Sequence, residues 1–382
     1  MTALAGKRIG LLSAHASHTN GGVFEAVVGH IALVRQLGAV PVVLAVADAA
    51  HAEDAWRLDG AEIHLAEGVG PPQPGYAPQL PGLLDEARLD LLHLHGTWHY
   101  ASHAAGEWAR RSERPLVVSP HGMLDPWITE RNRWKKHLAR FAWEKRAWTR
   151  AAAFHALTGD EAGDIARETG AATIATIANP APPLSPPKTR LAPPMALYLG
   201  RIHEKKNLIA LMEGWLAARP KLPHDASLTI AGWGDSEGVA ALERFLENTG
   251  PSIQFVGAAF GSQKAALLDV ARFIVLPSLS EGLPMAILDG WAAGVPAITS
   301  PACHLPEGPA AGAALPCATD PASIAEAFVG GFSRGETQWL AMSQAAQALA
   351  SGPFGADTIA SAWERLYSKL LVSRGLPARP GR

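Results

Sequence analysis

The sequence has little cysteine and no long hydrophobic run, which argues against a disulfide-rich protein and against a membrane-spanning one. Only two cysteines, Cys303 and Cys317, occur among 382 residues, which excludes a disulfide-stabilised scaffold and favours a reducing compartment. The longest uncharged apolar run, residues 38–47, is too short for a bilayer, which takes about 20 residues to cross. The first residues also lack the pattern of a signal peptide. We therefore expect a cytoplasmic protein.

An excess of positive charge is absent as well. The formal net charge is −2 at pH 7, whereas a general nucleic-acid-binding protein needs a basic surface, so no nucleic-acid partner is expected. Hydrophobic residues make up 48% of the chain and charged residues 18%, which is ordinary for a globular protein with large cores. At about 100–200 residues per domain, the length predicts two domains.

Short apolar runs alternate with amphipathic, helix-length segments in both halves of the chain. Near-continuous apolar strands separated by helices are typical of parallel sheets covered on both faces. The predicted fold class is therefore α/β, with two Rossmann-like, doubly wound domains facing a cleft. We expect strands at 7–13, 41–46, 89–95, 116–120, 154–158, 195–200, 227–234, 252–257, 273–277 and 296–300, and helices at 22–37, 102–111 and 160–169.

A proline-rich stretch divides the two halves. Seven of the sixteen residues from 179 to 194 are proline. Proline fixes φ and removes a backbone donor, so a semi-rigid connector is expected. We predict a first domain at 1–180, a linker at 181–194, a second domain at 195–355, a helix at 356–372 that can cross back to the first domain, and a disordered tail at 373–382.

The stretch SLSEGLPMAILDGWAAG, residues 278–294, holds two carboxylates eight residues apart. The preceding apolar strand delivers Glu281 to its carboxyl end, and Pro284 suits the first turn of the helix that carries Asp289. The start of this helix presents unpaired N–H groups to an anion, while the carboxylates can accept hydrogen bonds from hydroxyl groups. A ligand with phosphates between two diols fits this pattern, although an N-terminal charge preference plus a surface acid explains it too.

Two further segments follow strands in the second half. LGRIHEKKN places Arg201 and Lys206 near a helix start, where cations and free N–H groups favour a phosphate-bearing ligand; a solvated basic helix start is the alternative. AGWGDSEG has Glu237 where a dinucleotide-binding motif needs its third glycine, so NAD binding is weakly supported. Gly232 and Gly234 form either a tight turn beside a ligand or a purely structural turn.

Together these segments resemble retaining glycosyltransferases of the GT-B fold, family four. The family's Glu-x7-Glu signature is matched by PSLSEGLPMAILDGWAAGVP, and its G-R-x-x-x-x-K element by GRIHEKK. The resemblance covers most of residues 195–300 closely and the first half more loosely. Two departures are Asp289, where the family usually has glutamate, and Gly290, where alanine is common.

The resemblance assigns roles to individual residues. Arg201 and Lys206 would hold the donor diphosphate, Glu281 the donor-sugar hydroxyls and Asp289 the nucleotide ribose. His121, in SPHGMLDPW, resembles the histidine that touches the donor sugar. The expected catalytic residues are thus His121, Arg201, Lys206 and Glu281, and the expected donor-binding residues are Gly21, Gly22, Gly200, Gly232, Gly234, Gly257, Gly282, Leu283, Pro284 and Asp289.

The segment HLHGTWHYASH, residues 93–103, is rich in histidine. His95 and Trp98 are expected to line the cleft and bind the acceptor. A metal cluster built on His93 and His95 is the alternative, although the carboxylate ligands of such a hydrolase are not evident nearby. We therefore expect no metal site.

A basic, aromatic segment spans residues 131–150. It carries eight lysines and arginines against one glutamate, and aromatic residues recur every seven positions at 127, 134, 141 and 148. Such a stripe can rest on an anionic membrane surface or a lipid-linked acceptor. It can equally pack on the sheet with basic residues at its edge.

The resemblance implies a retaining glycosyltransferase. It would transfer a sugar from a nucleotide diphospho-sugar, bound mainly by the second domain, to a glycan or lipid-linked saccharide acceptor bound by the first, in cell-surface polysaccharide biosynthesis and without a metal or other cofactor. The enzyme would be cytoplasmic or peripheral on the inner face of the membrane. Three alternatives stay open: a sugar-nucleotide epimerase of the same fold, a metal-dependent hydrolase, and a non-catalytic, membrane-associated sugar-binding protein.

Overall fold

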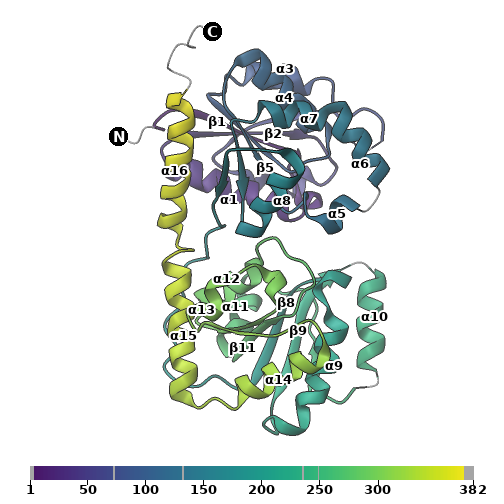
Figure 1. Cartoon of the computed structure of the whole chain (residues 1–382), viewed down its shortest axis with the longest axis vertical. Coiled ribbons are helices and arrows are strands. Elements are labelled where there is room, and N and C mark those ends of the chain that lie inside the picture. The colour runs from purple at the N-terminus through teal and green to yellow at the C-terminus, as the bar shows by residue number, and fades with distance from the viewer. Residues whose placement is uncertain (1–3, 72–73, 131–132, 235, 248, 374–382) are drawn as a thin grey trace. The chain divides into compact units, whose positions relative to one another are not determined.

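The chain forms two α/β units, each built on its own parallel sheet (Figure 1). The computed structural model describes residues 4–71, 74–130, 133–234, 236–247 and 249–373. The first unit contains the residues up to 178 and those from 360 onward, and the second contains residues 179–359. The predicted class of two doubly wound α/β units is confirmed.

The first sheet has seven parallel strands in the order β3-β2-β1-β4-β5-β6-β7. Its strands are β1 (Arg8–His15), β2 (Val40–Val46), β3 (Glu62–Ala66), β4 (Leu91–His95), β5 (Leu116–Ser119), β6 (Ala153–Ala156) and β7 (Ile174–Thr176). The helices are η1 (His18–Asn20), α1 (Gly22–Gln36), α2 (His51–Asp54), η2 (Ala55–Leu58), α3 (Leu80–Glu86), α4 (Tyr100–Ser112), α5 (Pro126–Glu130), α6 (Arg133–Ala139), the π-helical turn η3 (Arg140–Glu144), α7 (Lys145–Arg150), α8 (Gly159–Thr169) and α16 (Ala356–Ser373).

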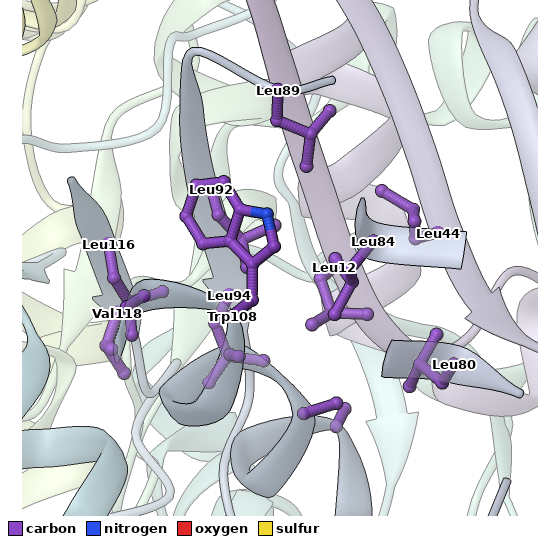
Figure 2. Close-up of a cluster of buried hydrophobic side chains, with 14 of the residues drawn as sticks. Leu12, Leu44, Leu80, Leu84, Leu89, Leu92, Leu94, Trp108, Leu116 and Val118 are labelled. Carbon is purple, nitrogen blue, oxygen red and sulfur yellow. The ribbon is translucent and has the colours of Figure 1, made fainter. Parts of the chain in front are cut away.

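Strand β4 shows why helices cover both faces of this sheet. Successive side chains of a strand point to opposite faces. Leu92 and Leu94 join the apolar cluster under α3 and α4, and Figure 2 shows Trp108 of α4 close to them. The intervening His93 instead contacts Trp363 of α16, on the other face. Because both faces are covered, β4 is buried throughout.

The second sheet has six parallel strands in the order β10-β9-β8-β11-β12-β13. Its strands are β8 (Met195–Ile202), β9 (Ser227–Gly234), β10 (Ile253–Phe255), β11 (Phe273–Leu276), β12 (Ala297–Thr299) and β13 (Ala314–Pro316). The helices are η4 (Glu204–Lys206), α9 (Leu208–Ala218), η5 (Arg219–Lys221), α10 (Ser236–Leu246), α11 (Gly261–Val270), α12 (Met285–Ala292), η6 (Pro301–Cys303), α13 (Glu307–Ala310), α14 (Pro321–Phe332) and α15 (Glu336–Ser351).

The structure contains three strands that the sequence analysis does not predict: β3, β7 and β13. All three lie at the edges of their sheets, where a strand needs no continuous apolar run. In β7 no residue is buried, and in β3 only Ala66 is. The periodic hydrophobic signal on which strand prediction depends is therefore weak in these segments.

The proline-rich stretch contains no helix or strand among residues 179–194. Its backbone is nevertheless fixed to the second unit. Ala181 N–H donates to Phe354 O at 2.8 Å and Ser185 N–H to Ala292 O at 2.9 Å. The Arg272 guanidinium also donates to Ala192 O, at 2.5 and 2.8 Å. The stretch thus runs along the second unit as a strap.

The C-terminal helix α16 packs against the first unit through Trp363 and Tyr367, both buried. The predicted disordered tail falls, from residue 374 on, outside the described residues. Within the described part of the chain, no helix is both long and apolar enough to cross a membrane.

Candidate functional site

The strand order places one site in the second unit. In a doubly wound sheet, ligands bind beyond the carboxyl ends of the strands, where the strand order reverses. Here that point lies between β8 and β11. Arg201 lies in β8, Lys206 in the short helix that follows it, and Glu281 in the loop after β11. The fold therefore brings together residues that are far apart in the sequence.

Lys206 and Glu281 form an ion pair at this point. The Lys206 Nζ atom lies 2.5 Å from Oε1 and 2.7 Å from Oε2 of Glu281. The Glu281 side chain is only 8% exposed, and the Ser278 hydroxyl donates to its Oε1 at 2.6 Å. The Lys206 ammonium can bind an anion, and the Glu281 carboxylate can accept a hydrogen bond from a hydroxyl group.

The loops that carry this pair are cross-linked by the backbone. Leu279 N–H donates to Lys205 O at 2.7 Å. Asn207, at φ 59°, caps the turn in the left-handed region, which asparagine tolerates better than most residues. Its amide donates to Pro277 O at 3.1 Å and to Thr319 O at 2.7 Å. The positions of Lys206 and Glu281 are therefore fixed before any ligand binds.

Arg201 differs from Lys206 in its surroundings. Its side chain is exposed, and its guanidinium makes no hydrogen bond or ion pair with any residue that the structure describes. The Tyr198 hydroxyl holds the backbone instead, by donating to Arg201 O at 2.8 Å. The guanidinium is thus available to an anion at the strand edge.

Asp289 also has a cationic partner. Lys264 of α11 places its Nζ 2.9 Å from each carboxylate oxygen of Asp289, which lies in α12. The sequence does not predict this contact, because no local sequence pattern links two residues that are 25 positions apart. Pro284 is the N-cap of α12, one residue before its first turn, and Leu283 beside it is buried.

The glycines of β9 have a structural reason. A Cβ on Gly232 would lie 2.0 Å from Gly200 O, and one on Gly234 would lie 2.5 Å from Ile202 O. Both glycines pair with β8 in register. Gly232 N–H also donates to Gly257 O at 2.8 Å. Of the two alternatives drawn from the sequence, the steric one explains these glycines.

An exposed aromatic pair lies at the same edge of the second sheet. Trp233 and Phe260 have ring centroids 5.2 Å apart. Trp233 is 50% exposed and Phe260 is 60% exposed. Phe260 directly precedes α11, the helix of Lys264. Neither aromatic residue stands in a sequence pattern that predicts a role for it.

In the first unit, the glycine loop lies between β1 and α1. Gly21, at φ 58°, is the N-cap of α1, and Gly22 is the first residue of that helix. Asp48, which follows β2, anchors the loop by accepting from the Ser17 and Thr19 hydroxyls, each at 2.5 Å. The N–H groups at the start of α1 are thereby held at the carboxyl edge of the sheet.

His95 and His121 lie together at that edge. Their rings stack at a centroid distance of 5.2 Å, and His95 Nδ1 lies 3.0 Å from His121 Nε2. Burial, followed by the nearby His155, lowers the pKa of His121 to about 3. His121 is therefore neutral at physiological pH, so its ring can form hydrogen bonds but carries no charge.

Glu161 positions the loop of His121. Its carboxylate accepts from Gly122 N–H at 2.5 Å and from Leu157 N–H at 2.7 Å, which ties the loops after β5 and β6 together. The segment Thr158–Glu161 has the T-x-x-E pattern of a helix start, and the Thr158 hydroxyl accepts from Glu161 N–H at 3.2 Å. That pattern is the signal that identifies Glu161 from the sequence.

Trp98 is held in a strained backbone conformation, with φ 72°. Its backbone N–H donates to the Glu144 carboxylate at 2.5 Å, and its indole N–H donates to Met123 O at 3.0 Å. Glu144 ends the π-helical turn η3 and is fully buried. Burial raises the pKa of Glu144 to about 7, although the hydrogen bond from the Trp98 N–H opposes the shift.

The histidine cluster is tied into the protein by hydrogen bonds. His93 Nδ1 lies 2.7 Å from the Tyr367 hydroxyl, and His93 Nε2 lies 2.6 Å from Ser119 Oγ. Both nitrogens of His93 are therefore occupied. Across the described residues, no group of three or more histidine, cysteine, aspartate or glutamate side chains is arranged to hold a metal ion. These contacts give the hydrolase alternative no support.

Family models match both halves of the chain. Residues 193–332 match the model described as glycosyl transferases group 1, and residues 14–180 match the glycosyl transferase 4-like domain. The chain belongs to the group 1 glycosyltransferases. The predicted resemblance and the predicted enzyme class, a retaining glycosyltransferase that uses a nucleotide-sugar, are thus confirmed.

Solved structures show the same fold for this glycosyltransferase. HepE of Anabaena, in complex with UDP and glucose, has a TM-score of 0.74 at 16% identity, covering 95% of this chain and 100% of that one. A glycosyltransferase from Rickettsia africae has a TM-score of 0.71 at 13% identity, covering 96% and 99%. WaaG, a glycosyltransferase involved in lipopolysaccharide biosynthesis, has a TM-score of 0.62 at 13% identity, covering 95% and 99%. None of the curated proteins compared with the chain matches it significantly.

Proposed function

We propose that this glycosyltransferase moves a sugar from a nucleotide diphospho-sugar to a glycan or lipid-linked saccharide during assembly of a cell-surface polysaccharide. The observation that carries the proposal is the Lys206–Glu281 pair at the strand edge of the second sheet. HepE, which has the same fold, binds UDP and glucose, and WaaG takes part in lipopolysaccharide biosynthesis. Both facts support the proposed substrates.

In the proposed reaction, the bond between the anomeric carbon and the diphosphate breaks as the acceptor hydroxyl attacks from the same face. The acceptor proton passes to the departing phosphate oxygen, and a nucleoside diphosphate leaves. Arg201 and Lys206 stabilise the negative charge that develops on the diphosphate. Fixed cations of this kind lower a barrier by a few kcal/mol per contact. Glu281 accepts hydrogen bonds from the donor-sugar hydroxyls.

The remaining parts of the donor have matching groups. Asp289 accepts from the ribose hydroxyls, and the exposed pair Trp233 and Phe260 offers an aromatic face on which a base can stack. In the first unit, neutral His121 bonds a donor-sugar hydroxyl and Trp98 contacts the acceptor. His95 is expected at the acceptor too, but it is only 2% exposed and lies against His121, so it supports that ring instead. The N–H groups behind Gly21 and Gly22 face the donor phosphates.

The experiment begins with thermal-shift measurements against UDP, GDP and ADP and their glucose esters. We expect one nucleotide family to raise the melting temperature. The matching donor is then supplied with lipid-linked saccharide acceptors, and both product linkage and nucleoside diphosphate release are measured by NMR. Stabilisation by no nucleotide at all would refute the proposal. Conversion of the donor sugar without an acceptor would support the epimerase instead.

A membrane contact forms the second part of the proposal. Trp134, Leu138 and Phe141 are spaced to share one helical face, and they are 68%, 60% and 79% exposed. Exposed Arg133 and His137 adjoin them on α6. We propose that this face rests on an anionic membrane surface, where a lipid-linked acceptor is found.

The rest of the aromatic stripe behaves differently. Trp148 is buried and contacts Trp98, with ring centroids 5.8 Å apart. The packing alternative therefore holds for Trp148, while residues 131 and 132 and the side chain of Trp127 lie outside the described residues.

Flotation with vesicles containing about one third phosphatidylserine tests the membrane contact. We expect the wild type to float with the vesicles at low salt. A Trp134→Ser, Phe141→Ser double variant should remain in the bottom fraction of the gradient. Trp56→Ser is the matched control because Trp56 is also an exposed tryptophan of the first unit. Equal flotation of all three proteins would refute this contact.

A further inference from the structure

A second lysine–acid pair lies beside the proposed nucleotide site. Helices α11 and α12 both begin at the carboxyl edge of the second sheet, after β10 and β11. Lys264 and Asp289 join them, with Nζ 2.9 Å from each carboxylate oxygen. Asp289 is the more buried partner, at 16% exposure against 36% for Lys264. The ammonium group thus faces solvent with the carboxylate behind it.

The donors and acceptors of this pair are only partly used. An ammonium group has three N–H donors, and a carboxylate has about four acceptor positions. The two contacts with Asp289 occupy two of the donors of Lys264 and leave one free. The carboxylate keeps acceptor positions on both oxygens. A hydroxyl group placed against the pair can therefore donate to Asp289 and accept from Lys264 at once.

Another lysine–acid pair involving α11 differs from this one in the exposure of its two partners. Lys188 lies 3.0 Å from Asp269, near the other end of the helix. The side chain of Asp269 is 82% exposed, so water can satisfy it. The Lys188 side chain is only 11% exposed, so in this pair the lysine is buried and the acid faces solvent. The largely buried carboxylate of Asp289, at the ligand edge, has no such access to water.

We infer that Lys264 is a specificity-determining residue, which fixes the short Asp289 side chain and donates a hydrogen bond to a ribose hydroxyl. The inference rests on the proposed function, in which Asp289 faces the nucleotide. The lysine compensates for the missing methylene of Asp289 by bringing its own donor to the diol. The pair then selects ribonucleotides over deoxyribonucleotides, because a missing hydroxyl leaves both groups without their partner.

The test compares UDP, GDP and ADP with their 2′-deoxy and 3′-deoxy forms by isothermal titration calorimetry. The variants are Lys264→Met, which keeps the length of the stem, Lys264→Arg, which keeps the charge, and Lys188→Met as the matched control. For the nucleotide that the wild type binds, we expect Lys264→Met to weaken ribonucleotide binding about tenfold, the value of one hydrogen bond to a charged group. It should weaken binding of one deoxy form much less.

The ratio of ribonucleotide to deoxynucleotide affinity decides the outcome, because a merely structural role would not change it. A reduced ratio in Lys264→Met, partial recovery in Lys264→Arg and no change in Lys188→Met support the inference. An equal loss for both ligand forms would mean that Lys264 contacts a phosphate, and unchanged binding would mean a structural pair; either result overturns the inference while leaving the proposed function intact. If the wild type binds none of these nucleotides, both proposals fail.

Discussion

Lys206 and Glu281 contact each other through both carboxylate oxygens, at 2.5 and 2.7 Å, on loops that follow two adjacent strands. Because Glu281 is nearly buried, neutralising either residue leaves the other charge without its partner. Removing one member of a buried pair is strongly destabilising, while removing both is often tolerated.

The first prediction separates catalysis from stability at this site. Arg201→Ala and Lys206→Ala should each lower turnover about 10²–10³-fold, because each removes a cation from the departing diphosphate. Lys206→Ala should also lower the melting temperature, since Glu281 loses its partner. Arg201→Ala should leave the melting temperature unchanged, because its guanidinium has no partner among the described residues.

Initial rates of nucleoside diphosphate release and differential scanning calorimetry provide the two measurements. Arg190→Ala, at another exposed arginine, is the control for both. Near-normal turnover in Arg201→Ala and Lys206→Ala would contradict their assigned roles.

The second prediction concerns the glycines of β9. Gly232→Ala should destabilise the second unit by about 1–3 kcal/mol or more, as overpacking does, because its Cβ would lie 2.0 Å from the backbone oxygen of Gly200. A backbone oxygen held in a sheet cannot move aside cheaply. Gly250→Ala is the control, since its Cβ meets no heavy atom within 4 Å. Equal unfolding free energies in urea for both variants would show that the sheet can adjust.

The positions of Arg201, Lys206 and Glu281 could be predicted from the sequence because each lies in a short local pattern that joins a strand to a helix. Their pairing is a consequence of strand order, which places β8 beside β11. The Lys264–Asp289 contact could not be predicted, since it depends on how two helices pack rather than on any local pattern. The same is true of Glu144, which the π-helical turn directs into the core of the first unit.

The third prediction concerns Glu144 and pH. The pKa of its carboxyl is raised by burial from 4.5 to about 7 in the folded protein. The folded form therefore binds this proton more tightly than the unfolded chain does. Its contribution to folding is most favourable below pH 4.5 and is lost as the pH rises to about 7, a change of about 3 kcal/mol.

Glu144→Gln should abolish this part of the pH dependence, because the amide does not titrate. Urea unfolding of the wild type and the variant between pH 4.5 and 8, followed by tryptophan fluorescence, measures the difference. Glu67→Gln, at an exposed glutamate of the first unit, should keep the wild-type profile. A constant difference between Glu144→Gln and the wild type at all pH values would contradict the prediction.

The fourth prediction concerns a chain of buried hydrogen bonds in which each group accepts from one neighbour and donates to the next. His155 Nε2 lies 2.7 Å from the carbonyl oxygen of Ile177, which can only accept, so Nε2 carries the proton. His155 Nδ1 then accepts from the Ser119 hydroxyl at 2.7 Å. Ser119 in turn accepts from His93 Nε2, which leaves His93 Nδ1 to accept from the Tyr367 hydroxyl. The C-terminal helix α16 thus supplies the first donor of the chain.

Tyr367→Phe should destabilise the first unit by about 1–3 kcal/mol, because it leaves the buried His93 Nδ1 without a donor. Ser368→Ala removes a hydroxyl from the neighbouring position of the same helix. That hydroxyl is buried and has no hydrogen-bond partner in the described part of the chain, so this variant should not be destabilised. Thermal unfolding of the two variants gives the comparison, and equal stability would show that the hydroxyl of Tyr367 is dispensable.

Acid should disrupt the same chain in the wild type. Burial lowers the pKa of His155 to about 4, from an ordinary 6.5. His30 of α1 lies outside this hydrogen-bond chain, but its ring contacts Trp363 of α16 at a centroid distance of 4.5 Å, and burial lowers its pKa to about 3. Because the unfolded chain binds these protons more readily, the contribution of the neutral histidines is fully present above pH 6.5 and falls as the pH drops toward 4. Limited proteolysis at pH 7.5 and pH 4.5 should therefore release the segment after residue 355 faster at the lower pH, with a protease active at both. Tyr367→Phe should show a smaller difference between the two pH values, since its chain is already broken; an unchanged difference would mean that α16 is held by packing of Trp363 alone.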